Sequence, residues 1–177
     1  PGSGKTTLLC GTSPRDESKK TFKCIKDAGY TVFDELIYGV ADYMRIEGHG
    51  ELYENWGLFF NLAIDRAIDF YNAAKPDLLS FYDRGIYYFE IMAERYGCML
   101  PKKYHDFVKN NKYDDPVFII HPVLDIDMTK PHRIDHKYKI YSKNDRMEQH
   151  KKIIDLYKRY GYNVVEIPIL HDSTNMN

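Results

Sequence analysis

The chain opens with Pro1-Gly2-Ser3-Gly4-Lys5-Thr6-Thr7, a run of small residues followed by a lysine and two threonines. This stretch matches the second half of the pattern GxxxxGK[ST], whose first glycine would lie one residue before Pro1. Small residues allow consecutive backbone N–H groups to curl around a phosphate, and the N-terminus of a following helix adds a favourable dipole. The stretch therefore predicts a phosphate-binding loop between a strand and a helix, with that strand expected upstream of Pro1.

Two side chains of this loop carry its chemistry. The Lys5 ammonium can neutralise the β- and γ-phosphates of a nucleoside triphosphate, ATP or GTP, and the Thr6 hydroxyl can ligate Mg²⁺. The loop from Gly2 to Thr7 as a whole would contact the nucleotide. A chance Gly-Ser-Gly turn before a helix is the alternative, but the Lys-Thr pair and the pattern downstream both favour a phosphate loop.

Downstream of this loop, strand-like runs alternate with helical patterns. The predicted strands are 30–33, 78–82, 116–120 and 163–167, and the predicted helices are 6–9, 19–28, 36–46, 58–74, 87–96, 102–110 and 145–160. Such alternation predicts an α/β fold, a parallel sheet with helices on both faces. With the strand upstream of Pro1, the sheet would have about five strands. No linker divides the chain, so we expect a single nucleotide-binding domain over 1–177, with a lid or insertion at 125–145.

Composition excludes several classes of protein. The 177 residues are 44% hydrophobic and 29% charged, with a net charge of −1, which argues against a protein built to coat nucleic acid. The longest apolar runs are too short to cross a bilayer, so no transmembrane segment is predicted. Three cysteines without a CxxC pair argue against a disulfide scaffold and for a reducing compartment, so we expect a cytoplasmic protein.

Charged residues directly follow two of the predicted strands. Asp83 and Arg84 come after 78–82, and Glu35 comes just after 30–33. Ligands bind at the carboxyl ends of parallel strands. There Asp83 can hold a Mg²⁺-bound water or accept a hydrogen bond from an attacking hydroxyl, and Arg84 can grip a phosphoryl group. Glu35 is a candidate substrate contact or base. The alternatives are a surface ion pair at the strand end for Asp83 and Arg84, and a helix N-cap or solvated turn for Glu35.

The segment 125–145 is polar and mixed in charge. A lid that bears arginine would place positive charge on a transferred phosphoryl group and exclude water. Arg146, which opens the next predicted helix, is the preferred candidate for that role, and Arg133 is the second. The basic part of this segment, 130–139, is also compatible with docking an anionic lipid, an RNA or a protein partner.

Histidines and tyrosines have simpler interpretations. No spacing typical of a metal site occurs among His121, His132, His136, His150 and His171. His132 and His136 are four residues apart, but Pro131 argues against a regular helix there, and we interpret these two as loop histidines. The 16 tyrosines are expected to be mostly packing residues, because the ring is apolar and the hydroxyl tolerates water.

The motifs together resemble the P-loop kinase superfamily, and more narrowly the predicted ATPases of the AAA-domain family that relates to nicotinamide riboside kinase and to nucleoside and nucleotide kinases. The resemblance rests on the loop Gly2–Thr7, on Glu35 and on Asp83-Arg84 after their strands, and on Arg146. It implies the P-loop NTPase fold with ATP or GTP and Mg²⁺. It assigns Asp83 to the magnesium shell beside Thr6, Arg84 to phosphate or substrate, Glu35 to the substrate side and Arg146 to the lid.

These observations predict an ATP- and Mg²⁺-dependent phosphotransferase acting on a small-molecule acceptor such as a nucleoside or nucleotide. Its predicted catalytic residues are Lys5, Asp83, Arg84, Arg146 and Glu35. Two alternatives stay open: an ATPase or GTPase module that docks an anionic lipid, RNA or protein through 130–139, and an ATPase that drives a partner.

Overall fold

The structure is a computed structural model that describes residues 25–122 and 142–168. The predicted phosphate loop Gly2–Thr7, the first helix and 125–141 of the predicted lid lie outside the described residues. The described residues divide into two compact units. The amino-terminal unit comprises 25–113, and the carboxyl-terminal unit comprises 114–122 with 142–168.

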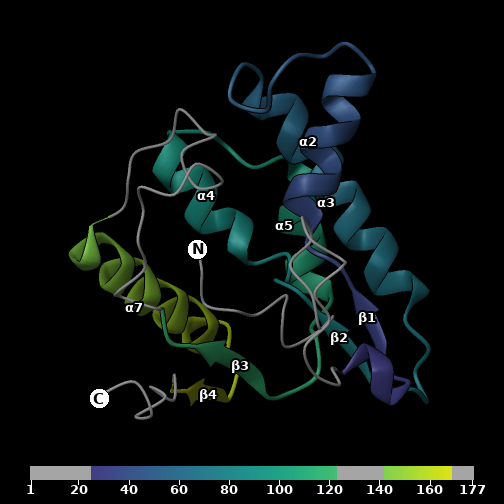
Figure 1. Ribbon diagram of the computed structural model, residues 1–177, viewed down its shortest axis with the longest axis vertical. Coiled ribbons are helices and arrows are strands. Elements are labelled where there is room, and N and C mark those ends of the chain that lie inside the picture. Colours follow the sequence, from purple (N-terminus) through teal and green to yellow (C-terminus); the bar gives the residue numbers. More distant parts are fainter. Residues whose placement is uncertain (1–24, 123–141, 169–177) are drawn as a thin grey trace, which may run out of the picture. The chain divides into compact units, whose positions relative to one another are not determined.

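A parallel pair of short strands lies in the amino-terminal unit. Strands β1 (Thr31–Phe33) and β2 (Ser80–Tyr82) lie side by side, with Phe33 opposite Tyr82 (Figure 1). The rings of these two residues stack with centroids 4.8 Å apart. The Asp83 N–H donates to the Phe33 carbonyl at 2.9 Å, so hydrogen bonding between the strands continues to their carboxyl ends.

A short turn of 3-10 helix precedes β1. This element, η1 (Lys26–Ala28), lies at the end of the predicted helix 19–28, of which the structure describes residues 25–28. Gly29 ends it in the left-handed conformation, with φ of 90°, and its N–H donates to the Lys26 carbonyl. Glycine is typical at this position after a helix, because it adopts the left-handed conformation without steric cost.

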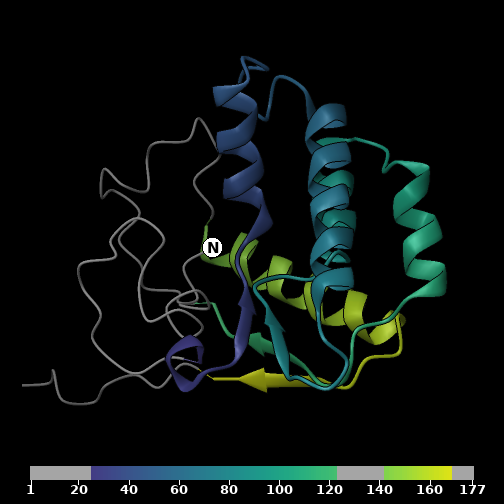
Figure 2. The ribbon, with the colours of Figure 1, turned by 90° about the vertical axis from the view of Figure 1, so that its right-hand side faces the viewer.

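Four helices complete the described amino-terminal unit: α2 (Leu36–Ile46), α3 (Trp56–Ala73), α4 (Tyr88–Tyr96) and α5 (Lys102–Asn110). The long helices α2 and α3 lie side by side (Figure 2). The bounds of α2 and α5 coincide with the prediction. Helix α3 begins two residues earlier than predicted, because the side chain of Asn55 accepts a hydrogen bond from the Leu58 N–H at 3.0 Å and caps the helix.

The core of this unit is rich in aromatic rings. Phe59 and Phe60 of α3 are fully buried, and both rings meet Phe89 of α4 edge to face. Tyr87 and Tyr104 are also buried, and their hydroxyls donate to the Asn111 carbonyl and to Glu90 at 3.3 and 2.8 Å. A buried tyrosine keeps its ring among apolar groups and satisfies its hydroxyl with one partner. Tyr87 and Tyr104 therefore have the packing role that was predicted for most of the 16 tyrosines.

The carboxyl-terminal unit contains a second parallel pair, β3 (Val117–Ile120) and β4 (Val164–Ile167), and the helix α7 (Lys143–Arg159). The helix begins two residues before its predicted start at Asp145, because Ser142 and Asp145 form a reciprocal capping box. The end of the predicted lid, 142–145, is therefore the cap and first turn of α7.

Helices and parallel strand pairs support an α/β fold. The described residues contain two separate two-stranded sheets, β1–β2 and β3–β4. One parallel sheet of about five strands stays a prediction. Within the described part of the chain, no helix is both long and apolar enough to cross a membrane.

Candidate functional site

The carboxyl ends of β1 and β2 bring Glu35 and Arg84 together. Arg84 Nη1 lies 3.0 Å from Glu35 Oε1, and the two side chains are 20% and 8% exposed. Each residue lies two positions after the end of its strand, and the two strands are parallel neighbours, so their carboxyl ends meet at one edge. The contact is therefore a largely buried ion pair, rather than one between solvated surface groups.

Glu35 stands at the N-cap position of α2 but does not cap it with its side chain. Its backbone is extended, with φ of −60° and ψ of 121°, and the carboxylate makes no capping hydrogen bond. The carboxylate turns to Arg84 instead. The neighbouring Asp34 is exposed. Of the two acidic residues after β1, Glu35 is thus the one directed toward the strand-end cluster.

Asp83, the residue directly after β2, is buried. It is 2% exposed, and its own N–H is bonded to β1. A carboxylate at this edge is the kind of oxygen ligand that Mg²⁺ prefers. The chemistry of Asp83 therefore fits the predicted role in a magnesium shell.

Arg84 has an unusual backbone conformation. Its φ is 77°, and among the described residues it is the non-glycine residue with positive φ. This conformation costs an ordinary residue about 1–2 kcal/mol, and such strain concentrates at functional sites. The guanidinium carbon lies 4.6 Å from the centroid of the Tyr88 ring. A guanidinium has five N–H donors, so its pairing with Glu35 does not exhaust its capacity to bind a phosphate.

The electrostatic surroundings of Arg84 favour its charged form. Burial by itself lowers the pKa of this guanidinium, but the electrostatic effects of Tyr88, Glu35, Asp83 and Tyr38 outweigh burial. The pKa of Arg84 therefore lies above its ordinary value. The strand ends hold a fixed positive charge beside two carboxylates.

Arg146 belongs to the carboxyl-terminal unit. It lies in the first turns of α7 and is 5% exposed. His150 and Ile154, spaced four residues apart along the same helix face, are buried with it. The loop residues Lys5 and Gly2–Thr7 lie outside the described residues, as does Arg133.

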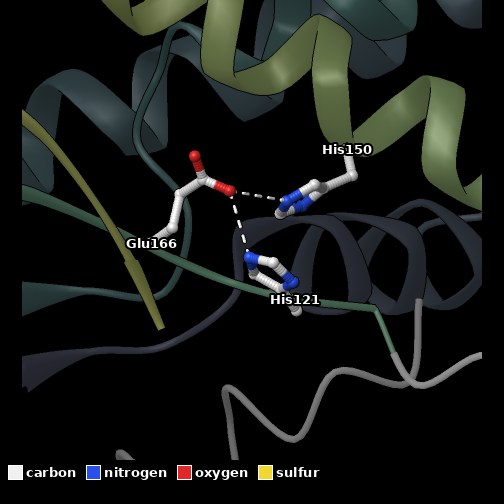
Figure 3. A group of neighbouring side chains, drawn as sticks. All are labelled: His121, His150 and Glu166. Carbon is white, nitrogen blue, oxygen red and sulfur yellow. Dashed lines mark hydrogen bonds and ion pairs between the residues drawn. The ribbon is translucent and has the colours of Figure 1, made fainter. Parts of the chain in front are cut away.

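Two histidines and a glutamate meet in the carboxyl-terminal unit. His150 lies inside α7, in agreement with the predicted helix 145–160, and its side chain is 8% exposed. Its ring and that of His121 both face the carboxylate of Glu166 in β4 (Figure 3). Hydrogen bonding from His150, aided by His121, holds the pKa of Glu166 below its ordinary value. Sequence spacing could not find this cluster, because its members are 16 and 45 residues apart.

Residues 1–174 match the model of a family described as "AAA domain". The chain therefore belongs to this family, an AAA-type member of the P-loop proteins, which agrees with the predicted superfamily. Searches of curated proteins and of solved structures give no match. Family membership implies an α/β P-loop fold, and it points to nucleotide binding or hydrolysis as the general activity.

Proposed function

We propose that the protein is an ATP- and Mg²⁺-dependent phosphotransferase that acts on a small hydroxyl- or phosphate-bearing acceptor, such as a nucleoside or nucleotide. The family supports the nucleotide half of this proposal. The observation that carries the acceptor half is the Glu35–Arg84 ion pair beside buried Asp83 at the ends of β1 and β2. A phosphotransferase needs a base for the acceptor hydroxyl and positive charge for the phosphoryl group, and the Glu35–Arg84 pair offers both. Because the family match covers both units, we also propose that they are parts of one domain.

The phosphate loop would hold the nucleotide. Lys5 neutralises charge on the β- and γ-phosphates, and backbone N–H groups of Gly2 to Thr7 surround them. Thr6 and Asp83 supply oxygen ligands for Mg²⁺, which, when bound, neutralises charge between the β- and γ-phosphates. The burial of Asp83 supports this assignment, because a carboxylate held in a fixed place pre-organises the site.

Transfer would proceed at the strand ends. The acceptor oxygen attacks the γ-phosphorus, the bond from that phosphorus to the β–γ bridging oxygen breaks, and ADP leaves. The proton of the acceptor hydroxyl passes to a carboxylate. With Asp83 in the magnesium shell, we assign this proton to Oε2 of Glu35, whose Oε1 faces Arg84.

Positive charge on the transferred group would come from two arginines. Arg84 is held by Glu35 and by the Tyr88 ring, so little reorganisation is needed when a phosphoryl group arrives. Arg146 is the second candidate, consistent with its burial at the start of α7.

An acceptor screen tests the proposal. The full chain is incubated with ATP, Mg²⁺ and a panel of nucleosides, nucleotides and nicotinamide riboside, and ADP release is followed. The expected result is ADP release stimulated by one class of acceptor and abolished by Lys5→Ala. Tight nucleotide binding without stimulation by any acceptor, together with salt-sensitive binding to anionic lipid or RNA, would favour the docking module instead.

Matched arginine variants make the test specific. Arg84→Met and Arg146→Met should lower turnover by about 10²-fold or more while changing nucleotide affinity less. Arg95→Met in α4 and Arg159→Met in α7 are the controls, because both arginines are exposed and lie in the same units as the residues they match. Turnover that is equal in Arg84→Met and Arg95→Met would remove Arg84 from the mechanism.

A further inference from the structure

Three side chains with metal-binding atoms meet at the carboxyl ends of β3 and β4. Ile119 pairs with Glu166 in the parallel register, so these two residues lie on the same face of the strand pair. The next residue on that face after Ile119 is His121, whose N–H donates to the Ile167 carbonyl at 2.9 Å and extends the pairing. The strand alternation therefore places His121 and Glu166 on one face.

Helix α7 supplies the third side chain. Its buried residues include His150, Ile154 and Tyr157, which recur at spacings of four and three and form one helix face. This face packs toward β4, so His150 reaches Glu166 from the helix while His121 reaches it from the strand end. In Figure 3 both imidazole rings are directed at the same carboxylate oxygen.

The separations of the three groups fit a common metal ion. Glu166 Oε2 lies 3.0 Å from His121 Nε2 and 3.4 Å from His150 Nε2. One ligand atom from each of the three residues lies within 4.8 Å of the others. Two atoms that each bind a tetrahedral Zn²⁺ at about 2.1 Å are about 3.4 Å apart. Small side-chain rotations would therefore bring all three atoms to bonding distance.

We propose that His121, His150 and Glu166 form a site for one divalent transition-metal ion of the Zn²⁺ type. Two imidazoles and one carboxylate favour such an ion over Mg²⁺ or Ca²⁺, which prefer oxygen ligands alone. Three protein ligands leave a fourth position for water or a substrate atom. The site shares no residue with the proposed nucleotide and magnesium site, and it goes beyond the proposed phosphotransfer.

The exposure of the ligands supports this proposal. His150 is 8% exposed and is fixed by the packing of α7, whereas His121 and Glu166 are 41% and 43% exposed. One ligand is thus anchored, and two are open to the solvent from which an ion enters. A purely structural His–Glu–His contact between α7 and the strands is the competing explanation.

A Zn²⁺ titration distinguishes a metal site from a purely structural contact. The full chain is treated with EDTA and then titrated with Zn²⁺ alone, without nucleotide. Calorimetry should show one Zn²⁺ per chain for this site, and Zn²⁺ should raise the melting temperature. His121→Gln and Glu166→Gln should each weaken this binding at least about tenfold. His105→Gln, at an exposed histidine of α5, should leave it unchanged.

A second measurement covers variants that fold poorly. Co²⁺ bound to the unmodified chain should give the visible absorption of a site with nitrogen and oxygen ligands, without the charge-transfer band that a cysteine ligand produces. Zn²⁺ affinity that survives His121→Gln and Glu166→Gln, or a thiolate band with Co²⁺, would place the ion elsewhere and overturn the proposal. The absence of any Zn²⁺-dependent heat or melting shift would overturn it equally.

Discussion

The Glu35–Arg84 pair offers the sharpest test of the strand-end cluster. In Arg84→Met the Glu35 carboxylate keeps its place, 8% exposed, but loses the guanidinium 3.0 Å away. Breaking a fully buried ion pair costs about 3–5 kcal/mol, and an exposed pair contributes about 0.2–1 kcal/mol. Because Arg84 is 20% exposed, we expect a loss of about 2–3 kcal/mol from the pair. The lost contact with the Tyr88 ring adds about 0.5–1 kcal/mol.

A double-mutant cycle isolates the pair from these other effects. Arg84→Met, Glu35→Gln and the double variant are unfolded in urea, with the fluorescence of Trp56, the single tryptophan, as the probe. The expected coupling free energy is about 1–2 kcal/mol. The backbone strain at φ of 77° is the same for Met and Arg, so it cancels in the cycle.

A coupling free energy below about 0.3 kcal/mol would refute the reasoning, because it would mean that solvent screens the pair. The strain itself has a separate control. Arg84→Gly and Arg84→Ala both remove the ion pair, but only glycine adopts a left-handed backbone without cost. The glycine variant should therefore be more stable by about 1 kcal/mol.

Two further predictions concern the end of α4. Gly97 has φ of 64° and open space where a Cβ would stand, so Gly97→Ala should cost about 1 kcal/mol of backbone strain and no clash, as measured by urea unfolding. Burial raises the pKa of Tyr96 above 10.0 in the folded protein, more than the nearby charge of Arg95 lowers it. Its contribution to stability is therefore fully present below pH 10 and is lost as the pH rises through the raised value, so unfolding free energy should fall less steeply there in Tyr96→Phe. Equal slopes in the two proteins would contradict this assignment.

Local sequence signals determined most of the secondary structure. Helices α2 and α5 have the predicted bounds, and glycines in the left-handed conformation, Gly97 and Gly161, follow the ends of α4 and α7. These features depend on residues a few positions apart, whose spacing and caps are visible in one dimension. The starts of α3 and α7 were misplaced by two residues because the caps Asn55 and Ser142 were not identified.

The sequence also determined which residues stand at strand ends. Apolar runs followed by Asp34 and Glu35 or by Asp83 and Arg84 are sufficient for that, because a strand's carboxyl end is a position along the chain. The P-loop family was indicated in the same way, by the continuous stretch Gly2–Thr7, and the family match over 1–174 agrees with it.

Only the tertiary structure decided how these residues are paired. Glu35 turns to Arg84 instead of capping α2, and this contact depends on the pairing of β1 with β2, which brings the two strand ends to one edge. No local signal marks Arg84, rather than the following Gly85, as the residue with positive φ. The meeting of His121, His150 and Glu166 depends on a strand register and a helix face together. Partners separated by 16 to 49 positions leave no periodic trace in the sequence, since only the path of the folded backbone brings them within bonding distance.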